Sequence, residues 1–110
     1  MTPEGKVKSW VKTAMKGLRA DGYGVYSFWP VQTGMGASTL DSLHCINGWF
    51  VSIETKAKGK TMTERQETVA GDMVHAGALV FEVDSKESLE LAMTVIRNKC
   101  RLSSPKRTVA

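Results

Sequence analysis

Residues 40–56, LDSLHCINGWFVSIETK, decide the fold of this chain. Asn47-Gly48 stands between two runs rich in apolar and β-branched residues, and both residues tolerate the positive φ angles of a type I′ turn. The pattern therefore predicts two antiparallel strands, Leu40–Ile46 and Trp49–Lys56, joined by a two-residue turn.

The turn also predicts which residues of the two strands face each other. In a two-residue hairpin Ile46 pairs with Trp49, and counting outward brings Asp41 opposite Glu54. Opposed residues point to the same face of a sheet, with Cβ atoms about 5 Å apart. Lys56 follows Glu54 by two residues and shares its face. Two carboxylates and a lysine are expected together.

Two opposed carboxylates destabilise a sheet unless something compensates their charge. A divalent cation is one compensator, since Mg²⁺ prefers carboxylate oxygens and keeps several waters that it can activate as nucleophiles. The alternative is a solvated pair at the end of the sheet, neutralised by lysines nearby. A β-bulge would also change the register. The spacing by itself leaves these alternatives open.

Periodicity outward from the hairpin predicts further helices and strands. Thr2 precedes apolar residues at helical spacing, and Thr63 with Gln66 forms a capping box before another helix. The last strand is almost fully apolar, which is typical of a strand buried on both faces. The predicted elements are helices Pro3–Ala20, Glu64–His75 and one capped by Ser85, and strands Val25–Val31 and Ala78–Val83. The expected fold is α/β, with a mixed four-stranded sheet flanked by helices.

The 110 residues suit one domain, expected over 1–100, with a basic and disordered tail over 101–110. Nothing in the chain resembles a secretory signal or a membrane-spanning run, so we expect a cytoplasmic protein. Cys45 and Cys100 lie in apolar stretches and are expected to be buried free thiols. The net charge of +4 mildly favours a polyanionic partner.

Asp41, twelve intervening residues and then Glu54-Thr55-Lys56 resemble the D…(D/E)-x-K signature of the PD-(D/E)xK nuclease superfamily. The chain is most similar to the VRR-NUC family, particularly its small stand-alone phage members, over about residues 2–96. Further matching features are Glu4, the Gly34-x-Gly36 stretch, Thr63-x-x-Gln66 and Gly77-Ala78 before an apolar strand. In two departures, Leu40 stands where the signature's name has proline, and the Val-Arg-Arg run is absent.

The resemblance implies a restriction-endonuclease-like αβββαβ(α) core with a metal site. Asp41 and Glu54 would hold Mg²⁺ or Mn²⁺ with the Thr55 carbonyl, and Lys56 would orient water or stabilise charge on the phosphate. Gln66 would help to place the lysine or water, unless it only caps its helix. Glu4 would be an additional ligand, unless it only suits the first helical turn.

Five further lysines are candidate phosphate contacts, although a solvated lysine face would look the same. They are Lys6, Lys8 and Lys12 in the first helix and Lys58 and Lys60 in the loop after the hairpin. His44 points away from the Asp41 face and His75 lies near a helix end, so neither is expected in catalysis.

The expected activity is a Mg²⁺- or Mn²⁺-dependent endodeoxyribonuclease that selects DNA by shape, such as a Holliday junction or a flap. A homodimer is expected, because two sites are needed to cut paired strands. If phage-encoded, the protein would act in the host cytoplasm. The alternatives are a non-catalytic nucleic-acid-binding module with the same fold, and an oxygen-ligand metal protein unrelated to nucleic acid.

Overall fold

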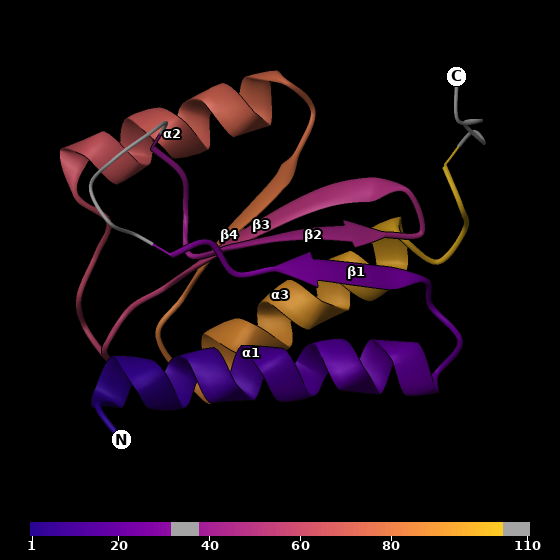
Figure 1. Ribbon diagram of the computed structural model, residues 1–110, viewed down its shortest axis with the longest axis horizontal. Helices are drawn as coiled ribbons and strands as arrows, with labels where there is room; N and C mark the ends of the chain where they lie inside the picture. Colours follow the sequence, from indigo (N-terminus) through magenta and orange to yellow (C-terminus); the bar gives the residue numbers. More distant parts are fainter. Residues whose placement is uncertain (32–37, 105–110) are drawn as a thin grey trace.

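The computed structural model describes residues 1–31 and 38–104 and shows an α/β fold in the predicted element order. The elements are α1 (Pro3–Ala20), β1 (Val25–Phe28), β2 (Ser42–Ile46), β3 (Trp49–Thr55), α2 (Glu64–His75), β4 (Leu79–Val83) and α3 (Lys86–Lys99). One sheet has the order β1-β2-β3-β4, with β3 and β4 parallel and the other two pairs antiparallel. The predicted mixed four-stranded sheet is therefore confirmed. The helices α1 and α3 lie on one side of it and α2 lies on the other (Figure 1).

The hairpin has the predicted register over its whole ladder, which ends one pair before Asp41 and Glu54. Asn47 and Gly48 have φ angles of 50° and 86°, as a type I′ turn requires. The ladder runs from Ile46 with Trp49 to Ser42 with Ile53 without a bulge. Local turn chemistry was sufficient to align these two strands.

The hydrophobic core lies between the sheet and the pair α1 and α3. Val11, Ile46, Val51 and Ile96 have no exposed surface and belong to one cluster of buried residues. Each apolar position in α1 recurs at three- or four-residue spacing, so the helix buries one stripe and leaves its lysines outside.

His44 faces this core, away from Asp41 as predicted, and is 1% exposed. Its ring nitrogens lie 2.7 Å from the hydroxyl of Ser27 and 2.8 Å from that of Ser42. Burial lowers the pKa of His44 to about 4, and the charge of Arg19 contributes in the same direction. A neutral imidazole is thus built into the packed side of the sheet.

The cysteine expectation was half wrong. Cys100 is buried, whereas Cys45 is exposed. Cys45 pairs with Tyr26 and Phe50 in neighbouring strands, and those two side chains are exposed as well. The sequence neighbours of Cys45, His44 and Ile46, point to the core, while its own side chain points to the other face.

The side of the sheet under α2 is packed more loosely. α2 has no buried residue, and β4 is the last strand in the sheet order. Within β4 only Val83 is buried and Glu82 is exposed. The expectation that this strand is buried on both faces is therefore wrong, because a strand at the sheet edge has one neighbour and only partial cover from α2.

Two expectations concern residues outside the described ranges. Gly34 and Gly36 and most of the predicted tail, residues 105–110, lie outside them. No helix among the described residues is long and apolar enough to cross a membrane.

Candidate active site

Asp41 lies immediately before β2 and is bonded to the end of β3. Its backbone N–H donates to Glu54 Oε1 at 3.0 Å. Its Oδ2 accepts from the Thr55 N–H at 3.0 Å and from the Thr55 hydroxyl at 2.6 Å. The two carboxylates that hairpin counting places together are therefore adjacent, and side-chain bonds continue the pairing where the ladder stops.

Glu54 stands at the centre of the site and is 1% exposed. Its Oε2 accepts from Gln66 Nε2 at 2.8 Å and lies 3.4 Å from Lys56 Nζ. Burial raises the pKa of Glu54 and the Asp41 charge raises it further, while Lys56 acts in the opposite direction. The stability of the ionised form of Glu54 therefore depends on the polar and charged groups that surround it.

Gln66 caps its helix and also contacts the site, and its expected role in placing the lysine or water stays a prediction. Its Oε1 accepts from the Thr63 backbone N–H at 2.9 Å, and the Gln66 backbone N–H donates to the Thr63 hydroxyl at 3.2 Å. This is the predicted capping box at the start of α2. Because the amide nitrogen of the same side chain donates to Glu54, the cap also connects α2 to the site.

The oxygens at this end of the sheet fit a hard divalent cation. In a strand, the N–H and C=O of one residue point to the same neighbour. The N–H of Thr55 points to Asp41 and that of Lys56 to Val83 in β4, so the Thr55 carbonyl also points toward the Asp41 side. Two carboxylates and one carbonyl are a ligand set that suits Mg²⁺ or Mn²⁺ better than a softer metal.

The expected role of Glu4 as an additional metal ligand stays a prediction. Glu4 is half-buried and lies one helical turn before Lys8, whose Nζ is 4.0 Å from Asp41 Oδ1. Within residues 1–31 and 38–104, no group of three or more His, Cys, Asp or Glu side chains is placed to hold a metal. Glu4 therefore does not complete a carboxylate cluster with Asp41 and Glu54 in this structure.

The five candidate phosphate-binding lysines have different neighbours in the structure. Lys8 reaches Asp41, whereas Lys12 lies over the ring of Trp29, 4.9 Å from its centroid. Lys60 is exposed in the loop after β3. Of the five, Lys8 is the one that the structure brings to the carboxylates.

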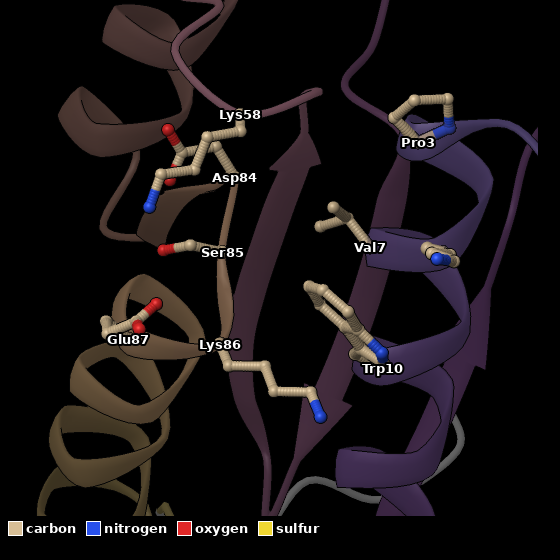
Figure 2. Close-up of a pocket in the computed structure, with 9 residues that line it drawn as sticks. Pro3, Val7, Trp10, Lys58, Asp84, Ser85, Lys86 and Glu87 are labelled. Carbon is tan, nitrogen blue, oxygen red and sulfur yellow. The ribbon is translucent and has the colours of Figure 1, made fainter.

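Lys6 and Lys58 line a separate cavity of about 340 Å³ between the beginnings of α1 and α3. In Figure 2 the Lys58 side chain runs beside Asp84, and the Lys86 side chain extends toward Trp10. The hydrogen bond from the Gly59 N–H is the main cause that lowers the pKa of Asp84, and the charge of Lys58 acts in the same direction. The lining of this cavity therefore contains both lysines and carboxylates. The carboxylates near Lys58 would compete with a phosphate for its charge.

Glu82 is a neighbour of the site that sequence reasoning missed. It is the Cα partner of Glu54 across the parallel β3–β4 pair, and its Oε2 accepts from the Met62 N–H at 2.6 Å. Glu82 thereby holds the loop that leads into α2. A single acidic residue in an apolar strand was the available signal, but no turn between β3 and β4 specifies their register.

No protein-family model, no curated protein and no solved structure matches this chain. Its class is defined by its own geometry: an α/β domain with two adjacent carboxylates, a lysine and a glutamine at one end of a mixed sheet.

Proposed function

We propose that the protein is a Mg²⁺- or Mn²⁺-dependent endodeoxyribonuclease with a restriction-endonuclease-like core, of the PD-(D/E)xK superfamily and its VRR-NUC family. The main support is the convergence of Asp41, Lys56 and Gln66 on a buried Glu54. Burial of an acid beside another acid is costly for folding alone. Such an arrangement is common where a protein holds a cation or tunes a pKa for catalysis.

Each side chain has a distinct task in this proposal. Asp41, Glu54 and the Thr55 carbonyl hold the cation, which supplies polarisation of the phosphodiester and an acidified water. Thr55 fixes the Asp41 carboxylate through two hydrogen bonds, and Gln66 fixes the Glu54 carboxylate. Lys56 stabilises the negative charge that builds on the phosphate as water adds and the P–O bond breaks.

DNA is the proposed substrate because the chain is basic and Lys8 and Lys56 lie beside the carboxylates. We propose recognition of DNA shape, as in a four-way junction or a flap, because Lys8 and Lys56 offer charge to a phosphate backbone and do not read base edges. We also propose a homodimer, since paired strands need two incisions.

A non-catalytic nucleic-acid-binding module is the rival function. One observation favours it: both Glu54 oxygens already have protein partners, namely the Asp41 N–H on Oε1, and Gln66 and Lys56 on Oε2. A carboxylate satisfied in this way has less need of a metal. The rival predicts DNA binding that is indifferent to divalent cations.

The two functions are separated by incubating four-way junction, flap, duplex and single-stranded DNA with Mg²⁺, Mn²⁺, Ca²⁺ or EDTA. We expect cleavage of a branched substrate in Mg²⁺ or Mn²⁺ and none in EDTA. The Glu54→Gln protein, purified identically, controls for contaminating nucleases. Binding without cleavage under every condition would establish the rival instead.

A further inference from the structure

The sheet face that carries the active site also carries a surface of exposed aromatic side chains. We call the residues Tyr26, Phe28, Leu43, Cys45 and Phe50 the aromatic face. Tyr26 pairs with Cys45 and Cys45 with Phe50, while Phe28 pairs with Leu43, so all five side chains point to the same side of the sheet. Tyr26, Phe28 and Phe50 are 71%, 52% and 44% exposed.

α2 lies on this side of the sheet but leaves the aromatic face open. Its Gln66 contacts Glu54, which shares a face with Phe50 in β3. Val69, Ala70 and Met73 form the less exposed stripe of α2, yet none of them is buried, and Val74 is 57% exposed. An amphipathic helix without a buried residue indicates that part of its apolar cover is missing.

The aromatic face has the size of the apolar centre of a dimer interface. A fully exposed aromatic side chain presents roughly 150–250 Å², so the three rings leave roughly 300 Å² in solvent, to which Leu43 and Cys45 add. A standard interface takes about 800 Å² from each partner, of which a little over half is apolar. The largest apolar patch on a monomer is of this order and is often functional.

Charge decides between protein and nucleic acid as the occupant. None of the five residues of the aromatic face carries a charge, and α2 on the same side of the sheet carries Glu64, Glu67 and Asp72 against Arg65. Surfaces that stack single-stranded bases combine their aromatic rings with a basic groove. Interface centres, in contrast, are rich in aromatic residues and poor in charged ones.

We propose that the aromatic face is the surface through which two copies of this chain form a two-fold dimer. The interface itself does not depend on catalysis, but its consequence for DNA rests on the proposed function. Asp41 precedes Cys45 by four residues, about 14 Å along an extended chain. With packed sheets about 10 Å apart, a two-fold axis near Cys45 would keep the two sites within roughly 30 Å. Such a spacing would allow one dimer to make paired incisions.

The first test measures mass by sedimentation, without DNA or metal. The wild-type protein should sediment as a dimer of the 12.0 kDa chain at micromolar concentration. Tyr26→Lys combined with Phe50→Lys should give a monomer with an unchanged circular dichroism spectrum. Leu91→Lys is the matched control, because Leu91 on α3 is 71% exposed, as Tyr26 is, and it should remain dimeric. A monomeric wild type, or loss of the dimer in the control alone, would overturn the proposal.

The second test uses Cys45 as a reporter that requires no destabilising change. A maleimide should label Cys45 more slowly as the protein concentration rises into the dimeric range, and Cys45→Ser should abolish the labelling, since Cys100 is buried. If single-stranded DNA protects Cys45 from maleimide in a protein that remains monomeric, the aromatic face binds nucleic acid and the dimer proposal is wrong. Neither readout involves cleavage, so a failure of these two tests contradicts the dimer interface and leaves the nuclease proposal unchanged. A dimer without nuclease activity would support the interface and contradict the nuclease proposal.

Discussion

The two faces of the sheet differ in how they treat buried polar groups. On the face under α1 and α3, His44 is buried and held neutral between two hydroxyls. On the face under α2, Glu54 is equally buried but surrounded by Lys56, Gln66 and Asp41. The first arrangement avoids a charge, whereas the second accepts one and supplies partners for it. Stability is concentrated on one face and the chemically competent groups on the other.

The largest effect should come from removing the charge at the centre of the α2 face. We expect Glu54→Gln to abolish cleavage, more than about 1,000-fold, because a cation ligand is lost. The fold should persist, and the unfolding free energy without metal should rise by about 0.5 kcal/mol as the repulsion with Asp41 disappears. Single-turnover cleavage and urea unfolding measure the two effects. Full activity in this variant would remove Glu54 from the site.

The next effect tests the opposite face through pH. The pKa of His44 is about 4 in the folded protein against 6.5 unfolded, so the unfolded chain binds more protons between these values. The stabilisation is complete above pH 6.5 and is lost as the pH falls toward 4, to a total of about 3 kcal/mol.

The control for this prediction is His44→Gln, which retains hydrogen-bonding capacity toward Ser27 and Ser42 but does not titrate. Urea unfolding of both proteins at pH 7, 5.5 and 4 should show a steeper loss of stability for the wild type. Parallel curves would mean that His44 does not contribute this pH dependence. The contribution of Glu54 to the pH dependence has the opposite sign. Because its pKa is raised in the folded protein, the unfolding free energy falls as the pH rises above the pKa of Glu54 in the unfolded chain.

A smaller effect separates catalysis from binding at Lys56. We expect Lys56→Ala to cut about 100-fold more slowly in single-turnover assays, the range typical for one electrostatic group, with nearly unchanged DNA affinity in Ca²⁺. Lys58→Ala and Lys60→Ala are the controls. Each should weaken binding and flatten its salt dependence by about one unit without slowing cleavage at saturating protein. Lost affinity with an unchanged rate would make Lys56 a phosphate contact only.

Local sequence patterns were sufficient wherever the deciding contacts lie close together in the chain. The Asn47-Gly48 turn specifies its own geometry, and each residue added to the hairpin follows from it, so Asp41 and Glu54 could be paired by counting. The beginnings and ends of α1 and α2 follow in the same way from Thr2, Thr63 and helical periodicity. The sequence could therefore predict two features of the site: that the two carboxylates are adjacent, and that Lys56 lies on the same side of the sheet as Glu54.

Only the tertiary structure decided which elements cover which face. The parallel pairing of Glu54 with Glu82, the bond from Gln66 to Glu54 and the approach of Lys8 to Asp41 all join segments that no tight turn aligns. The predicted burial of Cys45 was wrong for the same reason, because alternation separates two faces of a strand without saying which one a helix will cover. By itself the amino-acid sequence determined the helices, the strands and the hairpin register, since their geometry repeats within a few residues. The burial of Glu54 and the open aromatic face depend on packing between distant segments, and they exist only in the folded chain.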